Sequence, residues 1–175
     1  RILFAARPCD VASLPILDKL FSWDYQDAFY QKRRESTTII SLACDQPDKT
    51  CFCTSVGGSP SGEEGSDILL APLGDVYHVK GLTERGEGLI EKFSQFFEDA
   101  TEVHEQERQN LVEAWLGAVS KTLDTAGLQE ALSFEAPTWD ELTPQCVDCG
   151  ACTFLCPTCH CFDIQDEGKP REGER

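Results

Sequence analysis

Short apolar runs and longer helical stripes alternate along this chain, and together they predict an α/β fold in its N-terminal part. Four runs rich in aliphatic and β-branched residues predict strands at Ile2–Ala6, Thr37–Ala43, Ile68–Ala71 and Val76–Lys80. The first two are apolar almost throughout, so we expect both to be buried. A turn at Gly74-Asp75 separates the last two strands.

Apolar residues at helical spacing follow the first strand and predict a helix from Asp10 to Ser22, with Asp10 as its N-cap. Pro15 lies inside this segment and predicts a kink or a late helix start. Two further stripes predict helices, one formed by Leu89, Phe93, Phe96 and Phe97 and the other by Leu111, Val112, Trp115, Leu116, Val119 and Leu123. A third, shorter helix is expected around Leu128 to Ser133, and residues 56–66 are Gly/Ser/Pro-rich and predict a loop.

These elements predict three parts along the chain. Residues 1–100 form an α/β domain, residues 101–140 a helical connector, and residues 141–175 the first half of a ferredoxin-like module. The chain contains no methionine and begins at Arg1. We therefore expect it to be a piece of a longer protein.

The composition narrows the class of function. The 175 residues carry a formal net charge of −16, which argues against a nucleic-acid partner because phosphates would be repelled. An acidic surface is common among small electron carriers, although it also serves plain solubility. No apolar run approaches the roughly 20 residues of a membrane helix, so no membrane insertion is expected. Ten cysteines in cofactor-like groups favour a reducing cytoplasm over a disulfide scaffold.

The most specific motif is a cysteine run near the C-terminal end. Cys146, Cys149, Cys152 and Cys156 are spaced by two, two and three residues, and a proline follows. This is the spacing with which bacterial ferredoxins hold 4Fe-4S clusters. Gly150 lets the backbone pass close to the metal. A zinc site or a disulfide are the alternatives, but zinc sites usually come as two CxxC pairs separated by a longer loop.

A second set of four cysteines lies in the N-terminal part: Cys9, Cys44, Cys51 and Cys53. Cys9 and Cys44 come directly after the first two predicted strands, which should be parallel neighbours and end at the same sheet edge. Cys51 and Cys53 follow on a loop that could fold back to that edge. The set therefore predicts a second cluster, the alternatives being buried core cysteines or a redox disulfide.

Several other residues have more than one interpretation. Cys159 and Cys161 flank His160 and could bind zinc, supply a cluster ligand through Cys159, or simply pack beside the cluster. We expect His78 and His104 to be surface residues without partners. Of the cations Arg7, Arg33 and Arg34, we expect at least one near the N-terminal cluster or a partner interface, with a surface ion pair as the default. No catalytic triad, P-loop or GxGxxG motif is present.

Four segments together resemble the iron–sulfur beta subunits of sulfhydrogenases and the related 4Fe-4S dicluster subunits of anaerobic sulfite reductases: Arg7-Pro8-Cys9-Asp10-Val11-Ala12, Tyr30 with Arg33-Arg34-Glu35, Cys51-Phe52-Cys53-Thr54-Ser55, and residues 156–163. The resemblance covers nearly the whole chain. It implies an electron-transfer subunit with 4Fe-4S clusters. In that family a flavin-containing gamma-type partner handles a nicotinamide, a hydrogenase or sulfite-reducing subunit carries out catalysis, and the beta-type subunit has no substrate chemistry of its own.

The chain departs from this family because a second CxxCxxCxxxCP run is missing downstream. The resemblance then implies that Cys146, Cys149 and Cys152 bind one cluster whose fourth ligand lies beyond residue 175, while Cys156 belongs to another. The set at Cys9, Cys44, Cys51 and Cys53 is complete within the chain. The alternative functions are a zinc-stabilised binding module without a redox role and a free-standing reductase acting directly on a sulfur substrate.

Overall fold

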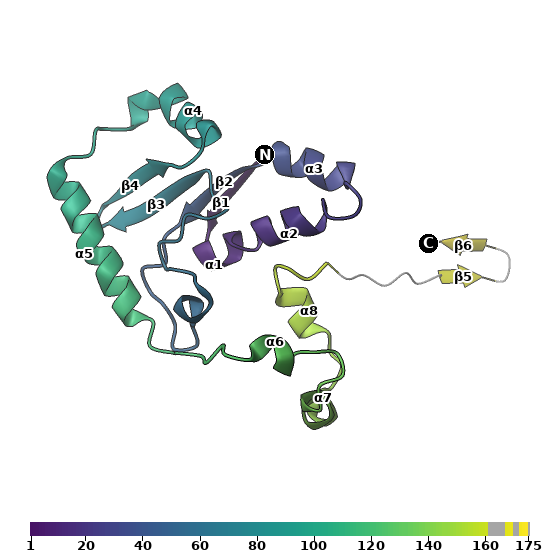
Figure 1. Cartoon of the computed structure of the whole chain (residues 1–175). Helices are drawn as coiled ribbons and strands as arrows, with labels where there is room; N and C mark the ends of the chain where they lie inside the picture. The colour runs from purple at the N-terminus through teal and green to yellow at the C-terminus, as the bar shows by residue number, and fades with distance from the viewer. Residues whose placement is uncertain (161–166, 170–171, 175) are drawn as a thin grey trace.

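A computed structural model describes residues 1–160, 167–169 and 172–174 (Figure 1). Its centre is a four-stranded sheet in the order β1-β2-β3-β4. The strands are β1 (Ile2–Ala6), β2 (Thr38–Leu42), β3 (Ile68–Leu73) and β4 (Val76–Gly81). β1, β2 and β3 are parallel, and β4 returns antiparallel to β3 after the turn at Gly74. The four predicted strands and the mixed α/β class are confirmed.

The core lies between this sheet and helix α5 (Glu102–Ala118), which contacts β3 and in Figure 1 crosses beside the end of β3 and the start of β4. Trp115 of α5 is only 6% exposed and packs in one cluster with Ala43, Leu69 and Ala71. β2 is buried as predicted, with Ile39 only 2% exposed. The sequence analysis placed α5 in the connector, yet its apolar stripe contributes to the core of the sheet. Val119 and Leu123 lie beyond the end of this helix.

The prediction that β1 is buried is wrong. Ile2, Leu3 and Phe4 are 60%, 44% and 66% exposed. β1 is the edge strand of the sheet, paired on one side with β2, and helix α1 packs on β2. An apolar run therefore identified the strand but not its position in the sheet, because edge and central strands can share the same composition.

The single helix predicted from Asp10 to Ser22 is divided into α1 (Pro8–Val11) and α2 (Leu14–Leu20). Arg7 rather than Asp10 is the N-cap residue of α1. Pro15 occupies the first turn of α2, where its missing N–H leaves no intrahelical hydrogen bond unmade, so the predicted late start is confirmed. Helix α3 (Ala28–Glu35) was not predicted; Asp27 caps it by accepting a 2.8 Å bond from the Tyr30 N–H.

The remaining elements are short. They are η1 (Cys53–Val56), α4 (Glu84–Lys92), η2 (Ser94–Phe96), α6 (Leu128–Ala131), α7 (Thr138–Leu142), η3 (Thr143–Gln145), α8 (Ala151–Leu155), β5 (Glu167–Lys169) and β6 (Glu172–Glu174). The helical stripe predicted up to Phe97 stops early: α4 ends at Lys92 and Phe96 is 77% exposed. Every helix in the described part of the chain is too short or too polar to cross a bilayer.

Buried polar groups fix the sheet against α4. Asp67 is 8% exposed, and its carboxylate accepts a 2.8 Å bond from the Ile39 N–H and a 2.6 Å bond from the Thr83 hydroxyl. Gly86 of α4 lies so close to the Asp67 carbonyl that a Cβ would come within 2.0 Å of its oxygen. The two buried acceptor oxygens are thus satisfied, and the close helix–strand approach requires glycine.

The expectation for His78 is also wrong. Its side chain is only 9% exposed, and Nε2 lies 2.6 Å from Glu105 Oε1. The partner comes from α5, whose position over the sheet could not be known from the sequence of β4. His104 is exposed, but its Nδ1 accepts a 3.3 Å bond from the Thr101 N–H at the start of α5.

Candidate metal centres

The first candidate centre is the sheet edge at which β1 and β2 end. The two strands pair in parallel, with Ile2 opposite Thr38 and Ala6 opposite Ser41, as the sequence analysis expected. Cys9 follows β1 on helix α1, and Cys44 follows β2. The pKa of the Cys9 thiol is raised, first by burial, then by the charge of Asp10, and least by that of Cys44.

A backbone irregularity turns the chain toward Cys9. The register of β1 against β2 shifts between Phe4 and Ala6, and Ala5 has a φ of +58°. A residue with a Cβ seldom occupies this left-handed region, and such positions cluster at functional sites. A bulge of this kind re-aims the strand that carries it. Here it directs the chain into Arg7 and the helix that holds Cys9.

The loop after Cys53 returns to the same edge. The Cys44 N–H donates a 2.8 Å bond to the Pro60 carbonyl, and a Cβ on Gly62 would lie 3.5 Å from Pro8 Cβ. Earlier in this loop, the Cys51 sulfur accepts a 3.2 Å bond from the Asp48 N–H. Cys53 opens the short helix η1. The loop therefore returns to this edge at Pro60 and Gly62, while the return of Cys51 and Cys53 to the edge stays a prediction.

Arg7 stands beside this edge. Its guanidinium donates a 2.8 Å bond to the Ala43 carbonyl, directly before Cys44, and lies 3.6 Å from an oxygen of Asp45. Arg34 instead pairs with Asp18 at 3.3 Å. Arg7 thus joins the segment after β1 to the segment after β2, next to the backbone that leads into Cys44. Its pairing with Asp45 is the ion pair expected as the default, and a place beside a cluster stays a prediction for Arg7.

The second candidate centre is the loop leading into α8. Asp148 and Gly150 both have left-handed backbone conformations, with φ of +54° and +68°, and Gly150 is the N-cap residue of α8. These two residues turn the chain tightly between Cys146 and Cys152. The Asp148 N–H points at the Cys146 sulfur at 3.4 Å. Backbone N–H groups directed at sulfur are a feature that tunes iron–sulfur sites.

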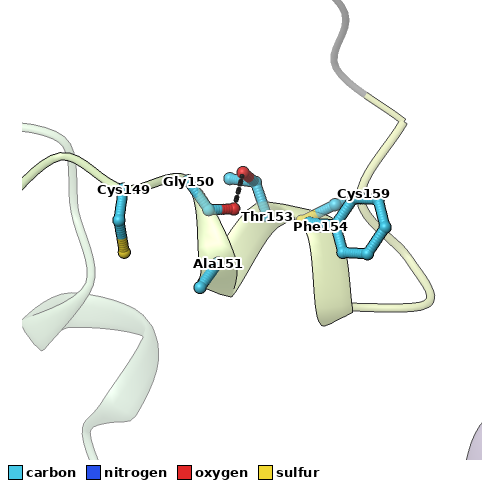
Figure 2. A pocket seen from close by; sticks show the side chains of 6 residues that line it. All are labelled: Cys149, Gly150, Ala151, Thr153, Phe154 and Cys159. Atoms are coloured by element: carbon cyan, nitrogen blue, oxygen red, sulfur yellow. Dashed lines mark hydrogen bonds between the residues drawn. The ribbon is translucent and has the colours of Figure 1, made fainter.

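A hollow of about 650 Å³ lies beside α8 (Figure 2). Its lining residues are Cys149, Gly150, Ala151, Thr153, Phe154 and Cys159. Thr153 closes the first turn of α8 through a 2.8 Å bond from its hydroxyl to the Gly150 carbonyl. Two thiols of the C-terminal segment, Cys149 and Cys159, therefore border one cavity.

Cys156 lies at the C-terminal end of α8 and is surrounded by hydrogen-bond partners. Its sulfur is 3.1 Å from the Thr158 hydroxyl. Bonds from this hydroxyl, from the Thr158 backbone and from the Cys159 thiol lower the pKa of Cys156 to about 7. A thiol with this pKa is partly thiolate at neutral pH, and thiolate is the form that binds metal.

The N-terminal part of the chain also contacts the C-terminal segment. His160 meets the ring of Phe21 edge-on at 5.9 Å between centroids, and Phe21 stacks on Tyr30 at 4.4 Å. Farther along, the Leu123 N–H donates a 3.0 Å bond to the Ser55 hydroxyl, next to Cys53. Sequence reasoning missed these contacts because they join residues far apart in the chain, and no local pattern reports such pairs.

The donor chemistry of both centres fits an iron–sulfur cluster, since each offers four thiols next to irregular backbone. However, in residues 1–160, 167–169 and 172–174 no three His, Cys, Asp or Glu side chains converge as a group that could hold a metal ion. The grouping of the eight cysteines into two ligand sets therefore stays a prediction. Cys161 lies outside the described residues.

Comparison with known proteins bears directly on these cysteines. The 4Fe-4S dicluster domain family matches residues 145–175, which contain the whole cysteine run. The sulfhydrogenase 2 subunit beta of Pyrococcus furiosus is 32% identical over 167 residues, which cover 94% of this chain. The chain is a homologue of a sulfhydrogenase beta subunit.

The present chain spans about half the length of that relative, since the match covers 49% of the Pyrococcus protein. No solved structure gives a significant match to the chain. The expected resemblance to sulfhydrogenase beta subunits is confirmed, as is the 4Fe-4S class of cofactor.

Proposed function

We propose that this chain relays single electrons through 4Fe-4S clusters between a flavin-containing, nicotinamide-linked partner and a catalytic subunit of hydrogenase or sulfur-reductase type. The observation that carries the proposal is the Cys146–Cys156 run on a tight left-handed turn, inside a segment that matches the dicluster domain. In the described residues no other constellation suggests bond-making chemistry. The chain thus acts as an electron-transfer subunit of a complex in a reducing cytoplasm.

We assign the ligands as two sets. Cys146, Cys149 and Cys152 hold one cluster at α8, and Cys156 serves this cluster or a neighbouring one, as in two-cluster ferredoxins. The second set is formed by Cys9, Cys44, Cys51 and Cys53. When bound, a 4Fe-4S cluster accepts and releases one electron at a potential set by hydrogen bonds to sulfur, nearby charge and burial.

The surroundings of the two sets would tune them differently. At the N-terminal edge, the Arg7 guanidinium supplies a positive charge that favours the reduced, more negative state of a cluster. At α8 the neighbouring backbone N–H of Asp148 and the Thr158 hydroxyl are directed at sulfur, while the net charge of the chain is −16. Each set therefore has its own means of setting a potential.

Exposed apolar residues around α8 support docking of a partner there. Val147, Phe154 and Leu155 are 84%, 89% and 76% exposed. Large apolar side chains exposed close together in the sequence suit an interaction site. A partner that covers these residues would also exclude water from a cluster at α8. This supports a position for the chain between two redox subunits.

The test is anaerobic purification of the full-length subunit followed by analysis of iron, acid-labile sulfide and zinc. The proposal predicts a brown protein with iron and sulfide in equal amounts, whose visible absorbance bleaches on reduction. Cys149→Ser should lower both contents, and Ser133→Ala, a change outside both sets, should leave them unchanged. A colourless protein with stoichiometric zinc would instead identify a zinc-stabilised binding module and overturn the proposal.

A further inference from the structure

The turn that follows α8 places two cysteines against each other. Residues 156–159 read Cys-Pro-Thr-Cys, and the Cys159 N–H donates a 3.1 Å bond to the Cys156 carbonyl. This bond closes a β-turn with proline in its second position, where proline is favoured. The proline fixes φ at that position, so the turn is held by its own covalent structure.

The geometry of the turn suits a disulfide. A β-turn brings its first and fourth Cα atoms within about 7 Å, and disulfides usually join residues whose Cα atoms are about 4.4–6.8 Å apart. The side chains also point the same way, because the Cys159 thiol hydrogen-bonds the Cys156 sulfur. Cys159 is exposed and also lines the hollow beside α8, so small molecules can reach it (Figure 2).

We propose that Cys156 and Cys159 form a reversible dithiol–disulfide site that reacts with low-molecular-weight disulfides. No disulfide joins two cysteines in the described part of the chain. Cys149 also borders the hollow, but it lies outside the turn at residues 156–159.

The reaction is a two-step thiol–disulfide exchange. One of the two cysteines, as its thiolate, attacks one sulfur of a glutathione-type disulfide, which forms a mixed disulfide and releases one small thiol. The other cysteine, as its thiolate, then attacks the protein sulfur of the mixed disulfide, forms the Cys156–Cys159 bond and releases the second small thiol. The two protein thiols are oxidised, the small disulfide is reduced, and the two protons leave on the two released thiols.

The consequence rests on the proposed function. Cys156 is one of the proposed cluster ligands, and a sulfur in a disulfide cannot bind iron as thiolate. Oxidation of the pair would therefore withdraw Cys156 from cluster assembly, and reduction would return it. The site would protect a cluster-free subunit under oxidising conditions and allow loading once a reducing environment is restored.

The experiment uses the full-length subunit, freed of metal by a chelator and incubated with oxidised and reduced glutathione at several ratios. Acid quenching, alkylation and fragment mass spectrometry locate the disulfides. The proposal predicts a Cys156–Cys159 bond that forms as the ratio becomes more oxidising and is lost on reduction. Wild-type protein suffices for this measurement, which is independent of any cluster.

Two variants sharpen the result. Cys159→Ser should leave Cys156 either as the thiol or as a mixed disulfide with glutathione at every ratio, whereas Cys161→Ser, which removes a neighbouring cysteine, should leave the Cys156–Cys159 bond in place. A bond from Cys159 to Cys149 or Cys161 instead of Cys156, or no bond at any ratio, would overturn the proposal. If the bond forms but oxidised protein takes up iron and sulfide at the C-terminal set as fully as reduced protein does, the dithiol site stands and the assignment of Cys156 as a ligand fails.

Discussion

The sheet domain and the cysteine segment around α8 differ in how far their apolar side chains are buried. Trp115, the largest side chain packed on the sheet, is 6% exposed, whereas Phe154 in α8 is 89% exposed. The sheet is held by burial of apolar surface, and its buried carboxylate Asp67 is fully hydrogen-bonded. The segment at residues 146–160 is held mainly by local turns, caps and sulfur-directed hydrogen bonds.

This difference indicates which interactions stabilise the fold of each region. The sheet domain has a core of its own, because Ala43, Leu69, Ala71 and Trp115 pack in one buried cluster. The α8 segment leaves its apolar residues facing outward, and under the proposed function its order comes from ligation of its thiols and from a partner surface. Left-handed residues occur at both cysteine sets, Ala5 before Cys9 and Asp148 beside Cys149. In both regions, the residues with a strained backbone lie close in sequence to cysteines and not among the buried core residues.

The two regions can be compared through a pair of tryptophans. Trp115→Ala should lower the free energy of unfolding by about 3–5 kcal/mol, because it leaves a cavity against Leu69 and Ala71. Trp139→Ala, in α7 and 36% exposed, should change it by less than about 1 kcal/mol. Urea unfolding followed by far-UV circular dichroism measures both. Equal losses for the two variants would mean that the C-terminal segment shares the core.

A pair of glycines on helix α4 tests the close packing of the sheet domain. Gly86→Ala should cost about 3 kcal/mol or more, because its Cβ would lie 2.0 Å from the Asp67 carbonyl oxygen and the helix would have to move. Gly88→Ala is the matched control: no atom lies within 4 Å of its Cβ, and alanine should stabilise the helix by up to about 1 kcal/mol. Thermal unfolding of both variants decides the point, and a tolerated Gly86→Ala would contradict this packing.

The smallest effect concerns the contact between β4 and α5. Hydrogen bonds from His78 and then Arg108 hold the pKa of Glu105 below its ordinary value of 4.5. A carboxyl with a lowered pKa in the folded state adds stability above its ordinary pKa and loses it as the pH falls through the folded-state value. Because Glu105 is 44% exposed, the effect should be below about 1 kcal/mol.

The measurement is the stability of wild type and Glu105→Gln as a function of pH. Wild type should be the more stable of the two at pH 7, and the difference should shrink below pH 4.5 as Glu105 takes up a proton. A difference that stays constant down to strongly acidic pH would show that the charge of Glu105 is not involved. Glu107→Gln, on the same helix, serves as the control.

Much of this architecture could be predicted from the sequence. The strands were predicted because runs such as Thr37–Ala43 and the turn at Gly74-Asp75 are local signals. The cysteine run was found because its spacing is specific to cluster loops. The helix around Asp10 was predicted as one piece because spacing alone does not reveal the break before Pro15.

The missed features all depend on long-range contacts. The exposure of β1 follows from its place at the sheet edge, which its own residues do not encode. The His78–Glu105 pair depends on α5 crossing the sheet, and the Phe21–His160 contact joins residues near opposite ends of the chain. The left-handed conformation of Ala5 gives no sequence signal, because alanine has no preference for that region.

The central claim is that two separate thiol sets of this chain hold 4Fe-4S clusters, and low-temperature electron paramagnetic resonance of the reduced full-length subunit tests it most directly. We predict at least two signals in wild type. Cys149→Ser should remove or alter the signal from the α8 set, and Cys44→Ser should do the same for the sheet-edge set, each leaving the other intact. Loss of every signal in either variant, or no change in both, would contradict two independent centres.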